Sequence, residues 1–323
     1  MRSAAATSVG LVAVCLAAIG LVRLHAQSIP MTEISLDGGG GGVADASVAA
    51  SPGGGGPEAI TFDGTYVWVA KQFTNTVTKL DPATRQQLGT VTVGARPVAL
   101  LRIGSSLWVA NLESDTLTKV RTSDGFVLGT FRAGSGPGGL AFDGANLWVA
   151  NRKSNTVSKV RPTDGVVLGT FAVGRRPLNM AWDGTSLWVV NNLADSVSKL
   201  RPSDGVIVGT SHVGNGPFGI LYDGSSLWVS NFFSANIMKL RPSDGALLAT
   251  YSVGDGPAGL AADTATLWVA NNGSSNVMRL DRATGAIRAT YTSGKGPFGV
   301  AFDGRSIWVA NFGGSSVSTA VAQ

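Results

Sequence analysis

The stretch PGGLAFDGANLWVANRKSNTVSKVRPTDGVVLGTFAVGRR, residues 137–176, decides the fold, because closely similar stretches precede and follow it without a gap. Tryptophan recurs every forty residues, at Trp68, Trp108, Trp148, Trp188, Trp228, Trp268 and Trp308. Proline recurs with the same period, at Pro57, Pro97, Pro137, Pro177, Pro217, Pro257 and Pro297. Two residue types that share one period indicate seven copies of a single structural unit.

Each unit has the pattern of a four-stranded antiparallel sheet. In residues 137–176, four short runs rich in β-branched and aromatic residues end in turn residues such as Asp143-Gly144. The run Leu147-Trp148-Val149-Ala150 is apolar on both faces, so both faces must be covered. Radial stacking of twisted sheets provides that cover. The sequence therefore predicts an all-β fold, a seven-bladed β-propeller with four-stranded blades over residues 57–323 and tryptophans wedged between the blades.

Closure of this ring requires a strand from outside the repeats. Seven full units from Pro57 would end at residue 336, whereas the sequence ends at residue 323, so the last blade lacks its outer strand. We expect the glycine-rich segment 27–56 to supply that strand and leave no open edge. Residues 43–50 lie nearest the required register, and residues 29–36 have the better strand composition. Both segments remain candidates.

Residues 1–26 have the pattern of a secretory signal peptide. Arg2 precedes an uncharged run from Ala4 to Val22, and Ala26 offers a small residue for cleavage before Gln27. The alternative is an uncleaved N-terminal membrane anchor, because the run approaches the roughly 20 residues that span a bilayer. Either interpretation predicts an extracytoplasmic protein, whether periplasmic, secreted or on the cell surface. Cys15, the only cysteine, lies in this segment, so no disulfide is expected in the mature chain.

The charge balance does not favour a nucleic-acid partner. The net charge of the whole chain is +5. Without Arg2 and Arg23 it is +3, from 23 basic and 20 acidic residues, and no basic cluster stands out.

Three stretches of the unit resemble the YVTN-type propeller repeat: residues 147–151 (LWVAN), 155–160 (NTVSKV) and 169–174 (GTFAVG). They are also similar to the broader NHL and streptogramin-lyase-like propellers. The resemblance covers residues 57–323 and implies a seven-bladed ring. Such propellers serve as surface proteins, binding scaffolds and occasionally enzymes, so the fold does not choose the function. Lys71 replaces an asparagine that the other six units carry.

Comparison of the seven copies with one another locates a candidate binding surface. The loops between the first and second strands, and between the third and fourth, hardly vary, and we call the rim that they form the invariant rim. The other two sets of loops differ from unit to unit, and antiparallel connectivity places both on the opposite rim. We call this the variable rim. Its candidate binding residues are Lys71, Phe73, Arg96, Arg152, Lys153, Arg175, Arg176, Phe218, Phe232, Phe233, Asp255, Lys295 and Phe312.

The variable rim combines a basic group with an aromatic group. Arg152, Lys153 and the pair Arg175-Arg176 lie around the third and fourth blades, and Phe232-Phe233 with nearby Phe218 lie in the fifth. Such a surface suits a protein, a glycan or a cell-envelope ligand. The alternative is neutral variation in solvent-exposed loops. The leading hypothesis is an exported, monomeric binding or scaffold protein that is not a catalyst and uses no cofactor.

A lyase is the alternative function. The resemblance to streptogramin lyases, of the virginiamycin B lyase type, implies a histidine, a glutamate and a magnesium ion for proton abstraction and elimination. The candidates here are His212, the only histidine after residue 26, and Glu113. They belong to the fourth and second units, so the hydrogen-bond reach that general acid–base catalysis needs is not expected. Zinc, copper and haem sites need more histidine or cysteine ligands than the chain has.

The asparagines at 111, 151, 191, 231, 271 and 311 repeat like catalytic residues. Asparagine favours left-handed turns and bonds its own backbone, so we interpret them as turn formers.

Overall fold

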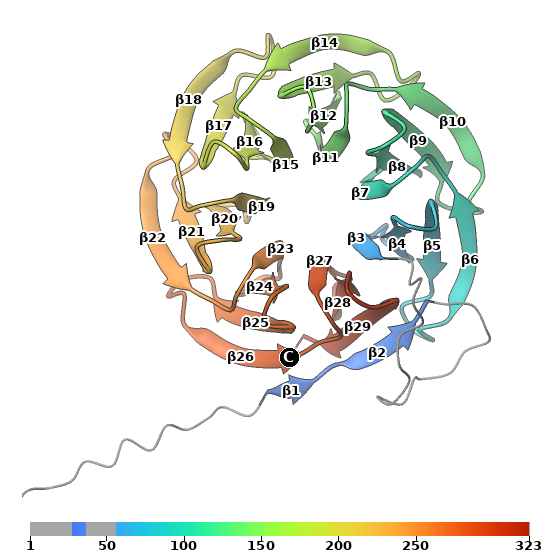
Figure 1. Cartoon of the computed structure of the whole chain (residues 1–323), viewed down its shortest axis with the longest axis vertical. Helices are drawn as coiled ribbons and strands as arrows, with labels where there is room; N and C mark the ends of the chain where they lie inside the picture. Colours follow the sequence, from blue (N-terminus) through green and yellow to red (C-terminus); the bar gives the residue numbers. More distant parts are fainter. Residues whose placement is uncertain (1–27, 37–55, 323) are drawn as a thin grey trace, which may run out of the picture.

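The computed structural model describes residues 28–36 and 56–322. These residues form 29 strands and no helix, and therefore no helix that could span a membrane. The strands are arranged as seven antiparallel sheets around a central axis (Figure 1). The predicted all-β, seven-bladed propeller is confirmed.

Each blade follows the chain from the axis outward, with blade 1 beginning at residue 57. The inner strands are β3 (Pro57–Phe62), β7 (Pro97–Ile103), β11 (Pro137–Phe142), β15 (Pro177–Trp182), β19 (Pro217–Tyr222), β23 (Pro257–Ala262) and β27 (Pro297–Phe302). The second strands are β4 (Val67–Lys71), β8 (Ser106–Asn111), β12 (Leu147–Asn151), β16 (Leu187–Asn191), β20 (Leu227–Asn231), β24 (Thr266–Asn271) and β28 (Ser306–Asn311). Proline suits the first position of an inner strand, because no ladder bond is needed there.

The third strands are β5 (Thr76–Leu80), β9 (Thr116–Arg121), β13 (Thr156–Val160), β17 (Ser196–Leu200), β21 (Asn236–Leu240), β25 (Asn276–Asp281) and β29 (Ser316–Val321). Six outer strands follow in the chain: β6 (Gln87–Thr92), β10 (Val127–Arg132), β14 (Val167–Ala172), β18 (Ile207–His212), β22 (Leu247–Ser252) and β26 (Ile287–Thr292). The outer strands expose many large apolar side chains, among them Leu128, Leu168 and Val208.

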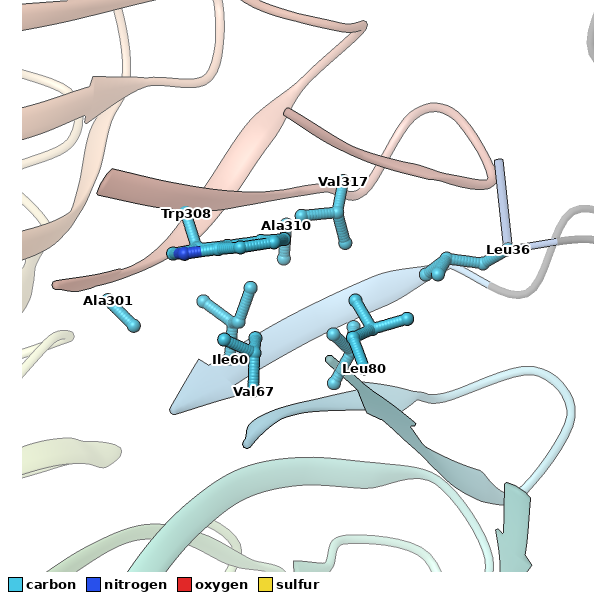
Figure 2. Packing of buried hydrophobic residues seen from close by; sticks show 9 residues of the cluster. Leu36, Ile60, Val67, Leu80, Ala301, Trp308, Ala310 and Val317 are labelled. Carbon is cyan, nitrogen blue, oxygen red and sulfur yellow. The ribbon is translucent and has the colours of Figure 1, made fainter. Parts of the chain in front are cut away.

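The ring is closed by residues near the N-terminus. Strand β2 (Thr32–Ser35) pairs antiparallel with β29 and completes blade 7. Strand β1 (Ile29–Pro30) pairs in parallel with β26 and gives blade 6 a fifth strand. Leu36 then packs between Leu80 of blade 1 and Val317 of blade 7 (Figure 2). Of the two segments that the sequence proposed, residues 29–36 occupy the site, and residues 43–50 lie outside the described residues.

The tryptophans pack between neighbouring blades, as the sequence predicted. Trp148 is fully buried in one cluster with Leu187 and Val189 of the next blade. Its indole N–H donates to the carboxylate of Asp143 over 2.8 Å, so its one polar atom is satisfied. This unit of the repeat thus supplies both the tryptophan that packs between the blades and the aspartate that accepts its indole hydrogen bond.

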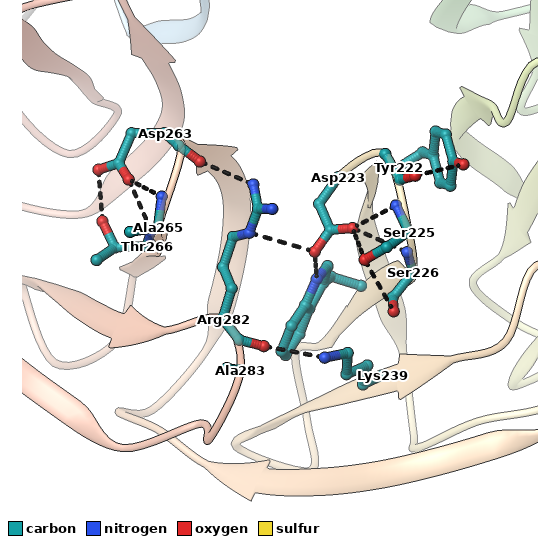
Figure 3. A network of polar contacts seen from close by, with 12 residues as sticks. Tyr222, Asp223, Ser225, Ser226, Lys239, Asp263, Ala265, Thr266, Arg282 and Ala283 are labelled. Atoms are coloured by element: carbon teal, nitrogen blue, oxygen red, sulfur yellow. Dashed lines mark hydrogen bonds and ion pairs between the residues drawn. The ribbon is translucent and has the colours of Figure 1, made fainter.

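Lysines connect successive blades. Lys159 of blade 3 donates to the carbonyl of Pro202 in blade 4 at 2.8 Å. Equivalent bonds to the next blade come from Lys79, Lys119, Lys199 and Lys239. The bond from Lys239 ends on Arg282, whose guanidinium lies 3.4 Å from Asp223 of blade 5 (Figure 3).

The last two seams have no lysine, because Arg279 and Thr319 occupy the equivalent positions. Arg279 bonds Thr266 within its own blade instead. The N-terminal residues span these same seams: β1 and β2 join blades 6 and 7, and Leu36 reaches blade 1.

The repeated asparagines neither adopt the left-handed conformation nor bond their own backbone through the side chain, so the interpretation as turn formers was wrong. They are fully buried at the ends of the second strands. Asn151, for example, donates to Thr156 at 3.0 Å and to Ser158 at 2.9 Å, which ties the second strand to the third. The left-handed conformation of this loop falls on Asn155 instead (φ 58°).

Candidate functional site

Residues from all seven inner strands line one cavity. The inner strands surround the ring axis (Figure 1). The volume of the cavity is about 180 Å³. The inner strands begin directly after the variable blade-to-blade loops, so their first residues lie at the variable rim. The chemically distinctive lining residues are Glu58, Arg152, Asn179, Phe218 and Phe298. The cavity therefore joins the axis to the rim that the sequence singled out.

One side of the cavity carries a buried ion pair between two blades. Arg152, from the loop after β12 in blade 3, places its guanidinium 3.6 Å from the carboxylate of Glu58 on β3 of blade 1. The arginine crosses directly over Gly138, where an added Cβ would lie 2.1 Å from its Nε. Glycine is therefore required at residue 138 for this path.

The surroundings of Glu58 oppose its ionisation. Its side chain is only 8% exposed, and burial raises the pKa of its carboxyl above the usual value. The positive charges of Arg152 and Arg96 act in the opposite direction without cancelling the effect of burial. The cavity thus contains a carboxyl group that takes up a proton more readily than an ordinary glutamate.

A second charged group lies next to this pair on the rim surface. Glu113 accepts bonds from Arg96 at 3.1 Å and from Lys153 at 3.3 Å. These bonds from Lys153 and Arg96 lower the pKa of Glu113. Arg96 also donates to the side chain of Gln72 at 2.8 Å. Because all three ionic groups are about half exposed, their mutual attraction contributes little to stability.

Another part of the variable rim is aromatic. Phe218 and Phe298, from blades 5 and 7, meet edge to face with ring centroids 4.7 Å apart. Phe312 lies 5.6 Å from Phe298, and Phe73 of blade 1 lies 5.9 Å from Phe312. Phe232 and Phe233 form a separate pair at 5.3 Å. Phe218 therefore belongs to a row of rings across the blades, and not to the group in blade 5 that the sequence suggested.

The remaining predicted binding residues are divided between the rim and the interior. Arg175, Arg176, Asp255 and Lys295 have exposed side chains on the variable rim. Lys71 is buried, and its ammonium donates to the carbonyl of Leu36 at 2.8 Å. Lys71 therefore holds the ring-closing segment, because it extends from the end of β4 toward the N-terminal residues.

The two catalytic candidates of the lyase alternative, His212 and Glu113, do not come together. His212 is exposed at the end of the outer strand β18, where its backbone pairs with Ser196. Among the residues that the structure describes, its side chain has no hydrogen bond or ion pair. Glu113 is held by two cations on the rim. The described residues also contain no cluster of three or more histidine, cysteine or carboxylate side chains.

Sequence reasoning missed Glu58, Gln72 and Phe298. Glu58 and Phe298 could have been found from the sequence, because each is the second residue of an inner strand. This position varies more from blade to blade than the positions on either side of it. Along the chain these residues are Glu58, Val98, Gly138, Leu178, Phe218, Ala258 and Phe298.

The fold and the site define a seven-bladed β-propeller with an axial cavity at its variable rim. No protein-family model and no curated protein matches the chain. Solved structures do match. Hydrazine synthase from Kuenenia stuttgartiensis aligns with a TM-score of 0.75 at 20% identity, covering 87% of this chain and 99% of that one.

Two streptogramin-lyase structures are similar in the same way. One is a catalytically inactive histidine-to-alanine variant of the virginiamycin B lyase from Staphylococcus aureus with quinupristin (TM-score 0.75, 18% identity, 91% of this chain and 99% of that one). A streptogramin B lyase aligns with a TM-score of 0.72 at 18% identity, covering 83% of this chain and 94% of that one. At these identities the likeness establishes the propeller fold alone.

Proposed function

We propose that the protein is an extracytoplasmic binding propeller that holds its ligand at the variable-rim end of the axial cavity. The observation that supports this most directly is the contrast across the cavity. The Arg152–Glu58 ion pair lines one part of it, and the Phe218–Phe298 contact lines another. Charged and apolar groups that converge on one concavity are typical of ligand sites.

Stability alone does not explain these residues. A buried ion pair loses solvation energy that its attraction often fails to restore, so apolar residues would serve a purely structural role at least as well. Phe73 and Phe233 are 63% and 74% exposed, which costs free energy unless something covers them. Both features point to a binding partner at this rim.

The shape of the site favours a small molecule or the end of a larger chain. A cavity of about 180 Å³ is smaller than most drug-sized pockets, so it would hold one end of a glycan, peptide or envelope component. The signal-like residues 1–26 are the basis for placing the protein outside the cytoplasm. Fractionation of cells that express the full chain tests this location.

Ligand-observed NMR with a library of small amphipathic molecules and oligosaccharides tests the proposal. We expect hits that are lost in Phe298→Ala and retained in Phe126→Ala. Phe126 is a suitable control, because it is 59% exposed and lies just before β10 on the invariant rim. A library in which no hit depends on Phe298 would contradict a site at the cavity.

The alternative is a carbon–oxygen lyase that acts by proton abstraction. One observation favours it: the raised pKa of Glu58 suits a base in a cavity. Glu58 would then take the role that the sequence assigned to His212 or Glu113. The described residues do not gather a donor set for magnesium, so no step is assigned to a metal. Incubation with quinupristin, followed by mass spectrometry, tests this alternative; ring opening that Glu58→Gln abolishes would establish it.

A further inference from the structure

Two buried hydrogen-bond donors near the charged side of the cavity have no acceptor among the described residues. They are Nε of Arg152 and Nε2 of Gln72. Arg152 lines the cavity itself. An unpaired donor in the interior loses the hydrogen bonds it had with water and gains none in return. Because Arg152 lines the cavity, a ligand there could supply the acceptor that its Nε lacks.

The charge around the cavity favours an anion as that acceptor. Glu58 is influenced by the positive charges of both Arg152 and Arg96, and Arg152 is also influenced by that of Arg176. Glu113, which pairs with Arg96 and Lys153, is the second carboxylate of this region. Two carboxylates thus lie among four cationic side chains, so the net charge around the cavity is positive. The Nε atom of Arg152 belongs to a planar guanidinium, whose geometry matches a carboxylate.

The aromatic part of the same cavity indicates the chemistry of the rest of the ligand. Phe218 and Phe298 line the cavity together with Arg152, so a ligand that fills it would contact both kinds of group. We propose that the cavity binds a monocarboxylate with an apolar body, its carboxylate on Arg152 and its apolar body against Phe218 and Phe298. A ligand with one negative charge is preferred to a dianion, because the repulsion from Glu58 grows with the charge of the ligand. This inference rests on the proposed function and names its ligand class.

Isothermal titration with 3-phenylpropionate, and with 3-phenylpropanol as its uncharged counterpart, tests the inference. We expect the acid to bind at least about tenfold more tightly than the alcohol. Arg152→Gln should remove that preference. Glu58→Gln should tighten binding of the acid several-fold, because Arg152 loses its competing partner and the repulsion disappears. A loss of affinity in Glu58→Gln would contradict the proposed arrangement, provided that circular dichroism shows the variant to be folded.

Arg305→Gln is the matched control, because Arg305 is exposed on the invariant rim and the substitution removes the same charge. Its affinity for the acid should equal that of the wild type. Equal binding of acid and alcohol, both lost in Phe298→Ala, would overturn the carboxylate site and leave the proposed function standing. Absence of binding by either compound would also overturn the inference. Failure of the proposed function itself is recognised separately, by a library in which no hit depends on Phe298.

Discussion

Ile103 lies where the other six blades carry an aspartate, and the buried indole N–H of Trp108 has no hydrogen-bond acceptor as a result. In the other blades the indole N–H donates to that aspartate, as Trp68 does to Asp63 at 2.7 Å. The six acceptors are Asp63, Asp143, Asp183, Asp223, Asp263 and Asp303. Blade 2 therefore has the repeat's tryptophan without its hydrogen-bond partner.

Restoring the acceptor should stabilise the protein. We expect Ile103→Asp to raise the free energy of unfolding by about 1 kcal/mol, because it satisfies a buried donor. The free energy gained from the new hydrogen bond should exceed the free energy lost with the apolar contacts of Ile103, since Ile103 is only partly buried. Urea denaturation measures the change. Ile103→Ala is the control, which removes the packing without adding an acceptor and should lower stability.

The aspartate–tryptophan bonds should make stability depend on pH. Burial opposes ionisation of Asp143, but hydrogen bonds from Trp148, Asn146 and Ala145 outweigh it and lower the pKa below 3.8. A carboxyl group whose pKa is lower in the folded state stabilises the protein above the unfolded value and loses that contribution as the pH falls through the folded value. Asp183, Asp223 and Asp263 are shifted in the same direction.

We therefore expect the melting temperature to fall as the pH decreases below 3.8, the unfolded value for Asp143. Asp143→Asn keeps an acceptor for the indole and cannot titrate, so its stability should change less than that of the wild type between neutral and acid pH. A variant with the same acid sensitivity as the wild type would show that Asp143 contributes nothing to this dependence.

The ring-closing residues should contribute measurably to stability. Leu36 is 2% exposed between blades 7 and 1, so Leu36→Ala should lower the free energy of unfolding by about 3 kcal/mol. A chain that begins at residue 37 should also melt lower and aggregate more than one that begins at residue 28, because the edge of β29 becomes open. Calorimetry and size-exclusion chromatography compare the two. Equal melting temperatures would contradict a closing role for β1 and β2.

Gly138 controls the position of Arg152. In Gly138→Ala the new methyl group would lie 2.1 Å from Nε of the present side chain, so the arginine must leave its present position beside Glu58. Since Arg152 lowers the pKa of Glu58, its displacement should raise that pKa further. Carbon-13 NMR of labelled glutamate measures the change. Gly89→Ala provides a control for glycine replacement outside the cavity, because an added Cβ there meets no atom within 4 Å, and it should leave Glu58 unaffected.

The sequence by itself determined the architecture. Forty-residue spacing of tryptophan and proline specified seven blades, and apolar residues on both faces of Leu147-Trp148-Val149-Ala150 required each sheet to be stacked between others. These features repeat locally, so one unit contains the information for all. The repeats also separated an invariant rim from a variable one, because loops on each rim could be compared seven times.

Only the tertiary structure decided which side chains meet at the axis. Glu58 and Arg152 are 94 positions apart in the sequence, and Phe218 and Phe298 are 80 apart, yet ring closure brings each pair into contact. A local pattern indicates which face of the sheet a residue occupies, but it does not indicate which distant blade that residue contacts. The direction taken by Arg152 depended on the missing side chain of Gly138, and the burial of Lys71 depended on where Leu36 docked. These are consequences of closing a ring, and no single repeat contains them.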